Sequence, residues 1–192
     1  MLVDAGKQGA RDAWQVLANG GVAALCAAAS AAFGQPLLAA AFAGAFAAAS
    51  ADTWGTEIGT LSREQPRSIL NFKPVAAGLS GGVTALGTAA EVGGACAVAL
   101  VAAATGAAPF AAVAAGGVAG ALADSLLGAC LQERRYCAAC DRDCETNPHA
   151  CGTPTTAVRG LRWVSNDAVN ALATLTGALA AACVRTFFPG SR

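Results

Sequence analysis

The stretch AWQVLANGGVAALCAAASAAFGQPLLAAAFAGAFAAASA, residues 13–51, contains no Asp, Glu, Lys or Arg. It is interrupted only by Gly34-Gln35-Pro36, which is typical of a tight connection between two helices. Each half is long enough to cross a bilayer, because a spanning helix needs roughly 20 apolar residues. The stretch therefore predicts two consecutive membrane spans joined by a short turn.

The composition of the whole chain agrees with a membrane protein. Hydrophobic residues make up 55%, charged residues only 12%, and the mean hydropathy is +0.51, whereas soluble domains are about a quarter charged. An Ala-rich soluble helical bundle is the alternative. We predict an all-α, polytopic helix bundle in a single membrane domain, residues 1–192. Its spans lie at about 13–33, 37–60, 80–105, 109–131 and 164–185.

The distribution of basic residues predicts the orientation of these spans. The segment before the first span and the loops 61–79 and 132–162 fall on one side and hold nearly all Lys and Arg, whereas the opposite turns, near 34–36 and 106–108, hold none. Cytoplasmic loops carry an excess of basic residues. We therefore expect a cytoplasmic N-terminus, long cytoplasmic loops and a bacterial inner membrane. No secretory signal is expected, because Asp4, Lys7, Arg11 and Asp12 precede the first span.

Several polar side chains fall within the predicted spans, and Asp52 is the most informative. A carboxylate in hydrocarbon costs several kcal/mol unless it is paired. Asp52, Asn19 and Asp124 lie at a common depth of roughly 9–12 Å from the cytoplasmic side, at 1.5 Å per residue. Further polar residues follow on the same side: Glu57 and Asp167 nearer the surface, Glu91 nearer the midplane, and Asn166 and Asn170 one helical turn apart. This pattern predicts a polar cavity in the inner leaflet; the alternative is separate structural hydrogen bonds.

A basic loop leads into a glycine-rich segment at the predicted start of the third span. Arg67 and Lys73 precede Ser80-Gly81-Gly82, and free amides at a helix start bind anions well. Acids beside bound phosphates repel them unless Mg²⁺ lies between, and Mg²⁺ takes a few carboxylates plus phosphates and water. The expected Mg²⁺ ligands are Asp52, Glu57, Asp124 and Asp167. The alternative is that Lys73 and Arg67 only anchor the loop at lipid headgroups.

Ordered blocks along the chain resemble one known family. They are Arg11-Asp12-x-x-Gln15-Val16-x-Ala18-Asn19-Gly20-Gly21, Ala51-Asp52-Thr53-Trp54-x-Thr56-Glu57-x-Gly59, Phe72-Lys73-Pro74-Val75, Ser80-Gly81-Gly82-Val83 and Asn166-Asp167-x-Val169-Asn170. These blocks resemble the integral-membrane family called domain of unknown function 92. The resemblance extends from about residue 8 to about residue 185. That family includes the plant phytyl-phosphate kinase of tocopherol synthesis. Family members usually carry further hydrophobic helices before the Arg11-Asp12 block, so either an upstream start or a shortened form is expected.

The resemblance implies an enzyme that transfers a phosphoryl group from a nucleoside triphosphate to an isoprenyl monophosphate such as phytyl phosphate, giving the diphosphate. A more distant similarity to the dolichol and phytol kinases implies CTP as donor. Asp52, Lys73 and Asp124 would be catalytic, with Mg²⁺ to neutralise charge. Substrate and nucleotide would be bound by Asn19, Arg67, Ser80, Gly81, Gly82, Asn166 and Asn170.

A cysteine-rich segment interrupts the second long loop. Cys137, Cys140, Cys144 and Cys151 cluster there with His149, the only histidine of the chain. This composition suits structural zinc, although the ligand spacing is tighter than in a regular zinc ribbon. Reducing cytosol favours metal over a disulfide. Free thiols, and redox or disulfide chemistry, are the alternatives.

Two other functions remain open. Intramembrane acids and glycine-rich helices also mark ion or small-solute transporters, and seams of small residues such as Gly116 and Gly120, which lead to Asp124, suit a helix-packing scaffold. A transporter needs polar access from both sides, yet outer halves of spans such as residues 37–49 and 95–104 hold nothing ionisable except Cys96. The expected partners are membrane lipid, an isoprenyl phosphate and a nucleoside triphosphate, with no nucleic acid, and the oligomeric state is open.

Overall fold

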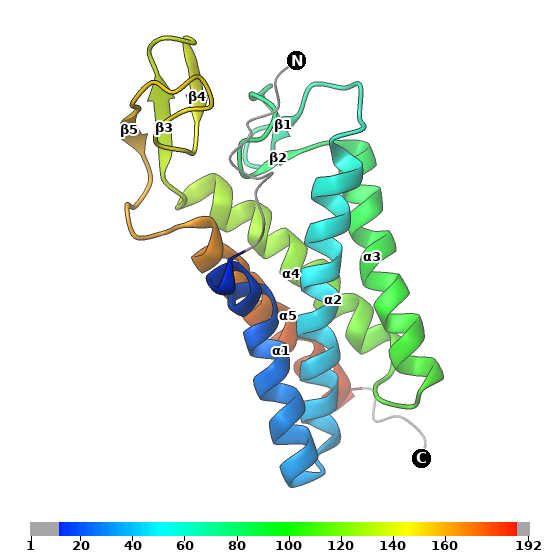
Figure 1. Cartoon of the computed structure of the whole chain (residues 1–192). Helices are drawn as coiled ribbons and strands as arrows, with labels where there is room; N and C mark the ends of the chain where they lie inside the picture. The colour runs from blue at the N-terminus through cyan, green and yellow to red at the C-terminus, as the bar shows by residue number, and fades with distance from the viewer. Residues whose placement is uncertain (1–11, 188–192) are drawn as a thin grey trace.

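The computed structural model describes residues 12–187, which form five long helices and two small sheets (Figure 1). The helices are α1 (Ala13–Phe33), α2 (Pro36–Gly59), α3 (Ala85–Ala104), α4 (Phe110–Cys130) and α5 (Asn166–Phe187). The strands are β1 (Arg67–Ser68), β2 (Gly82–Val83), β3 (Arg134–Cys137), β4 (Arg142–Cys144) and β5 (Thr156–Arg159). The terminal residues used to predict orientation and the absence of a signal include Asp4, Lys7 and Arg11, which lie outside the described residues.

All five helices are long and apolar enough to cross a membrane, which confirms the prediction of an all-α bundle of five spans. Local sequence explains several helix ends. The Asp12 side chain accepts a hydrogen bond from the Gln15 amide and caps α1, while Gly34 ends it in the left-handed conformation. Pro36 then begins α2, because a proline at the first helical position loses no hydrogen bond.

The bundle is held together by small residues that let helix backbones touch. α2 lies at its centre and packs against each of the other four helices. Gly44 of α2 meets Gly177 of α5, and a Cβ added to Gly44 would lie 2.5 Å from the Gly177 carbonyl oxygen and 2.3 Å from the Ala181 Cβ. Gly116 of α4 meets the same carbonyl oxygen, at 2.6 Å from an added Cβ. Close backbone approach of this kind drives helix association in lipid, where apolar side chains gain little from leaving the solvent.

The start of α3 corrects one expectation. Ser80-Gly81-Gly82 is not a helix start, because α3 begins at Ala85, where the Thr84 hydroxyl accepts a hydrogen bond from the Gly87 amide. Gly82 instead belongs to β2, which pairs antiparallel with β1. Gly81 has a φ of 76°, and a Cβ there would lie 2.3 Å from the Ala129 Cβ. This glycine therefore allows the loop to press against α4 and does not offer helix-end amides to an anion.

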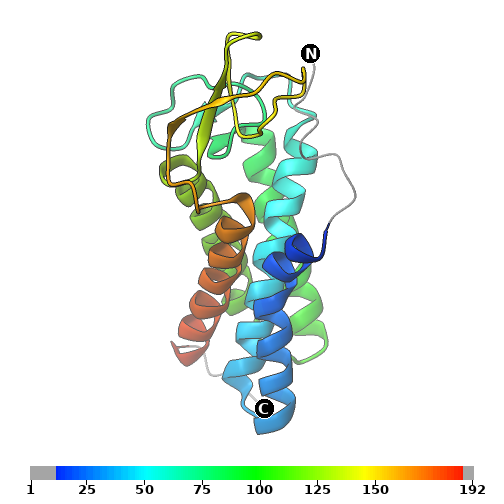
Figure 2. The same ribbon diagram turned by 60° about the vertical axis from the view of Figure 1, so that its left-hand side comes forward.

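Both sheets and the long connections, residues 60–84 and 131–165, lie at one end of the bundle, which we call the loop end (Figures 1 and 2). The two short turns, between α1 and α2 and between α3 and α4, lie at the opposite end (Figure 1). Strands β4, β3 and β5 form an antiparallel sheet in that order. We call residues 131–165 the lobe.

Candidate functional site

A large polar cavity of about 1890 Å³ opens at the loop end. All five helices contribute to its wall, and so do the connection 60–84 and the lobe. Nine of the residues predicted to form the site line it: Asn19, Asp52, Glu57, Ser80, Gly81, Gly82, Asp124, Asn166 and Asn170. The structure thus brings into one cavity residues that are more than 100 positions apart in the sequence.

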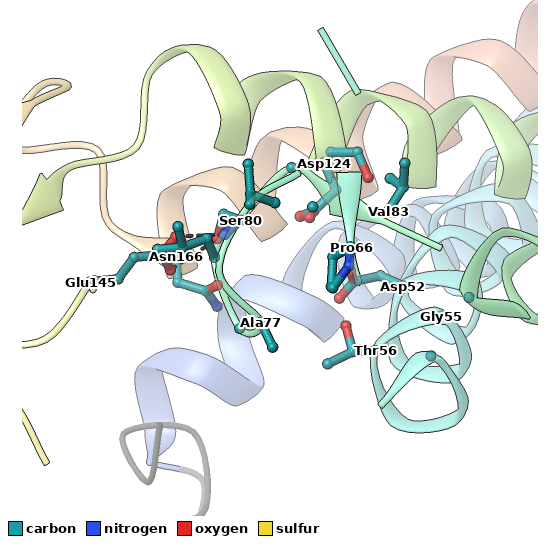
Figure 3. A pocket seen from close by; sticks show the side chains of 18 of the residues that line it. Asp52, Gly55, Thr56, Pro66, Ala77, Ser80, Val83, Asp124, Glu145 and Asn166 are labelled. Carbon is teal, nitrogen blue, oxygen red and sulfur yellow. Dashed lines mark hydrogen bonds between the residues drawn. The ribbon is translucent and has the colours of Figure 1, made fainter. Parts of the chain in front are cut away.

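Three carboxylates from three helices lie at one level in this cavity. Asp52 lies seven residues before the end of α2, Asp124 six residues before the end of α4, and Glu91 six residues after the start of α3. At 1.5 Å per residue, each is roughly 9–11 Å from the loop end of its helix. Figure 3 shows Asp52 and Asp124 in the same pocket, on opposite helices.

The position of Glu91 differs from the prediction that it lies nearer the midplane. Since α3 begins at Ala85 rather than near residue 80, Glu91 lies about one helical turn closer to the loop end. Its side chain packs over Gly55 of α2, where an added Cβ would lie 2.5 Å from the Glu91 Cγ. The missing side chain at Gly55 therefore admits Glu91 into the cavity. In the sequence, the feature that could have indicated this contact is Gly55, a glycine three residues after Asp52.

Amide side chains complete the wall beside the acids. Asn170 of α5 is buried, and Asn166 lies one turn before it, as the sequence predicts. Asn19 of α1 donates from its Nδ2 to the Gln15 carbonyl oxygen at 3.0 Å. Asn19 lines the same cavity as the acids, so its side-chain amide adds a polar group to this wall.

The lobe is joined to the cavity by a hydrogen-bond network centred on Glu145 (Figure 3). Its carboxylate accepts from the Ser80 amide at 2.6 Å and from the Ser80 hydroxyl at 3.0 Å. The same carboxylate accepts from the Gln132 Nε2 at 2.9 Å. Glu145 and Ser80 are 65 positions apart, and nothing in the sequence pattern indicates their contact. The network fixes the lobe against the loop that precedes α3.

Three predicted site residues lie outside this cavity. Arg67 donates from its guanidinium to the Phe72 carbonyl oxygen at 2.9 Å, and Lys73 is exposed on the same turn. The turn is closed by the Ser68 amide, which donates to the Lys73 carbonyl oxygen at 2.9 Å, so both basic side chains project from a local hairpin. Asp167 faces a separate groove of about 460 Å³ between α1 and α5, lined also by Trp14 and Leu17.

The basic residues that do line the cavity are Arg63, Arg142 and Arg162. They come from the connection after α2, from β4 and from the segment before α5. In the sequence, these arginines indicate only the orientation of the loops. No local motif marks them, because their common position depends on how the lobe folds over the bundle.

Four side chains in the lobe form a cluster that could hold a metal ion. The ligand atoms of Cys137, Cys140, His149 and Cys151 all lie within 4.8 Å of one another. The Cys137 and Cys151 sulfurs are 3.6 Å apart, and the His149 Nδ1 is 3.2 Å from the Cys151 sulfur. Cys144, which was expected in this set, lies outside it, and its thiol contacts the Thr146 carbonyl oxygen at 3.8 Å.

The hydrogen bonds around Cys151 favour its thiolate. The Thr153 side chain, followed by His149, lowers the pKa of Cys151 to about 5. A thiolate is the form of cysteine that binds metal. Four donors, three of them thiols and one of them predisposed to ionise, are the set found in closed tetrahedral metal sites.

Known proteins resemble parts of this chain. An uncharacterised membrane protein of Methanocaldococcus jannaschii is 40% identical over 90 residues, which are 46% of this chain and 38% of that protein. The Arabidopsis thaliana protein named Protein PGR is 33% identical over 108 residues, which are 49% of this chain and 38% of that protein. The matched regions therefore span well under half of either relative. No solved structure matches.

The family comparison covers far more of the chain. The family described as integral membrane protein DUF92 matches residues 2–178, a range that includes all the helices up to the middle of α5 and the whole lobe. This range also contains every residue of the cavity wall and of the cysteine cluster. The chain belongs to the DUF92 family of integral membrane proteins.

Proposed function

We propose that this protein is a membrane kinase that transfers the terminal phosphoryl group of a nucleoside triphosphate, with CTP as the expected donor, to an isoprenyl monophosphate such as phytyl phosphate. A phosphate oxygen of the lipid attacks the terminal phosphorus, a new P–O–P bond forms, and the nucleoside diphosphate leaves. The observation that carries the proposal is the meeting of Asp52, Glu91 and Asp124 at one level of a polar cavity in a membrane bundle. The family resemblance described above supports the same reaction.

The cavity residues suit Mg²⁺-dependent phosphoryl transfer. Three like charges at one level repel one another, and a divalent cation relieves that repulsion. When bound, Mg²⁺ would neutralise phosphate charge and align the two reacting groups. Asp52 and Asp124 would hold it, with Glu91 beside them, while Glu57 lies at the exposed rim. The acceptor phosphate is already anionic, so the reaction requires no catalytic base.

The lipid would approach from the membrane. The groove between α1 and α5 is lined by Trp14, Leu17, Ala18, Ala168 and Ala171, and it shares Ser165 with the cavity. An isoprenyl chain in this groove would place its phosphate at the cavity beside Asn166. The basic loops support a cytoplasmic loop end, and therefore a cytoplasmic source of nucleotide and an inner-membrane location.

Packing at the opposite end favours an enzyme over a transporter. Buried small side chains from three helices, among them Ala43, Ala99 and Val113, form a cluster there, and the helix segments around it contain no acidic or basic residue. A path for an ion or polar solute would have to cross this apolar layer at a high energetic cost. The polar cavity thus has one aqueous side.

The direct test is a phosphoryl-transfer assay with the full chain in lipid nanodiscs. Incubation with γ-labelled CTP or ATP, Mg²⁺ and phytyl phosphate is expected to give labelled phytyl diphosphate, separated by thin-layer chromatography. Omission of Mg²⁺ and replacement of phytyl phosphate by phytol are the controls, and neither should give the diphosphate. Label appearing in no lipid product with either nucleotide would refute the kinase assignment.

We also propose that the cluster of Cys137, Cys140, His149 and Cys151 holds a structural Zn²⁺. Tetrahedral Zn²⁺ has bonds of roughly 2.0–2.3 Å to nitrogen and sulfur, so its ligand atoms lie within the spread that the cluster shows. Two ligands lie at or near β3 and two follow β4, so the ion would tie together a small lobe with little core of its own.

We expect the purified protein to contain about one zinc ion per chain, and the Cys151→Ser variant to contain little, because three remaining donors bind Zn²⁺ more weakly. Elemental analysis by mass spectrometry measures the content. Cys144→Ala is the matched control and should keep its zinc, since the Cys144 sulfur is not in the cluster. Equal zinc in wild type and Cys151→Ser would exclude this site, and loss in Cys144→Ala would show that the ligand set is wrong.

A further inference from the structure

The arginines at the loop end fall into two groups. Those outside the cavity have partners: Arg134 pairs with Asp143 at 3.7 Å, Arg135 pairs with Glu133 at 2.9 Å, and Arg159 donates to the Ala129 carbonyl oxygen. Arg67 likewise donates to Phe72. Within residues 12–187, by contrast, three arginines line the cavity, and the side chains of Arg63, Arg142 and Arg162 form no hydrogen bond or ion pair. Among the loop-end arginines that the structure describes, the ones with unpaired side chains are thus the ones that line the cavity.

These three side chains reach the cavity mouth around the same hydrogen-bond network. Arg142 is three residues before Glu145, which bonds Ser80, and three residues span at most about 10 Å of chain. Arg162 follows Leu161, whose amide donates to the Leu131 carbonyl oxygen at 2.9 Å. Arg162 is therefore beside Gln132, which also bonds Glu145.

Arg63 approaches the same mouth from the other side. It lies three residues before Pro66, whose carbonyl oxygen accepts from the Val75 amide at 2.9 Å. The next residue begins β1, which pairs with β2 directly after Gly81. Arg63 therefore faces the mouth from the connection after α2, whereas Arg142 and Arg162 face it from the lobe.

The arginines lie nearer the mouth of the cavity than its three deepest acids. Asp52, Glu91 and Asp124 lie within the helices, roughly 9–11 Å from their loop ends, while the arginines come from segments beyond those ends. Acids also line the cavity near the mouth, namely Glu57, Glu64, Glu133 and Glu145. The acids nearest the arginines on the lobe are already engaged, because Glu145 accepts from Ser80 and Gln132 and Glu133 pairs with Arg135. An anion at the mouth would meet guanidinium groups with free donors.

We infer that Arg63, Arg142 and Arg162 bind the polyphosphate chain of a soluble nucleoside triphosphate, in place of the Lys73 and Gly81-Gly82 site expected from the sequence. This inference rests on the proposed kinase function for the identity of the nucleotide. Guanidinium groups bind phosphate oxygens through paired, charge-assisted hydrogen bonds. Three of them suit a triphosphate better than a lipid monophosphate, and their segments face the aqueous side rather than the groove between α1 and α5.

The test separates the two possible sources of phosphate. The full chain in phosphatidylcholine nanodiscs is titrated with Mg-CTP, with inorganic triphosphate and with geranyl phosphate, using calorimetry. The variants Arg63→Gln, Arg142→Gln and Arg162→Gln are each expected to weaken CTP and triphosphate binding by about tenfold or more, the loss typical of a charged hydrogen bond. Geranyl phosphate binding should change by less than about twofold, because the arginines are inferred to contact the polyphosphate and would act on the lipid phosphate only as exposed, solvent-screened charges.

Arg134→Gln is the matched control, because this arginine lies on the lobe outside the cavity and already pairs with Asp143. It should bind CTP as the wild type does. Unchanged triphosphate affinity in the three variants, an equal loss for geranyl phosphate, or an equal loss in Arg134→Gln would each overturn the assignment. Arg142→Lys, which keeps the charge but not the paired geometry, should recover part of the affinity. Triphosphate binding that depends on the three arginines, without any phosphoryl transfer, would refute the kinase function and leave the anion site standing.

Discussion

The Asp52→Asn variant is expected to lose phosphoryl transfer by about 100- to 1000-fold, the effect of removing a single group that stabilises charge in a transition state. The substitution keeps the size of the side chain and removes its negative charge. Asp52 lies at the same level as Asp124 and Glu91, so its proposed role is to hold Mg²⁺ there. The concentration of Mg²⁺ needed for half-maximal activity should therefore rise as well, which an assay over a range of Mg²⁺ would measure.

A carboxylate outside the cavity provides the control. Asp143 lies on β4 beside Arg142, but side chains alternate along a strand, and Asp143 does not line the cavity. Asp143→Asn should keep wild-type turnover and Mg²⁺ dependence. If Asp52→Asn turned over as fast as the wild type at every Mg²⁺ concentration, Asp52 would not be a metal ligand. A lower rate with an unchanged Mg²⁺ requirement would also contradict that role.

The Gly44→Ala variant is expected to lower the free energy of unfolding by about 1–3 kcal/mol, the usual range for overpacking a tight core. The added methyl group would lie 2.3 Å from the Ala181 Cβ and 2.5 Å from the Gly177 carbonyl oxygen. A backbone oxygen cannot rotate away as a flexible side chain does, so α2 and α5 would have to separate. Thermal unfolding in detergent, followed by circular dichroism, measures the change.

The Gly21→Ala variant, by contrast, should raise the free energy of unfolding. Gly21 lies in α1, and an added Cβ there meets nothing within 4 Å. Replacing a helical glycine with alanine then reduces the backbone freedom of the unfolded chain, which raises the free energy of unfolding by about 0.5–1 kcal/mol. Equal unfolding temperatures for Gly44→Ala and Gly21→Ala would show that the contact between α2 and α5 is looser than the structure has it.

The five helices were predictable because each is a long apolar segment with a clear interruption. The turn at Gly34-Gln35-Pro36 separates α1 from α2 where it was expected. The start of α3 was not predictable in the same way, because no charged residue separates Ser80 from α3, whereas Gly82 and Val83 form β2 and pair with β1. Hydropathy reports which residues suit lipid, and it does not report a local strand pairing.

The site was predictable where its residues belong to helices. Asp52, Asn19 and Asp124 were expected at one depth, and all three line the cavity, because depth follows from counting residues along a helix. Of the predicted residues outside the helices, Ser80, Gly81 and Gly82 line the cavity but Lys73 lies on an exposed hairpin. Arg142 and Glu145, which also line the cavity, were not predicted as site residues. Their positions depend on how the lobe folds, and no periodic pattern in the sequence encodes that fold.

The contact of Gly44, Gly116 and Gly177 also limits how the protein can move. Where helix backbones touch, one helix cannot slide past another without a steric clash between a carbonyl oxygen and the facing backbone. Sliding of α2, α4 and α5 against one another is therefore opposed. The lobe is held to the rest of the protein in a different way, by side-chain hydrogen bonds that include those from Ser80 to Glu145 and from Arg159 to the Ala129 carbonyl oxygen. Asp52 and Asp124, which belong to α2 and α4, would therefore keep their positions relative to each other if the lobe moved.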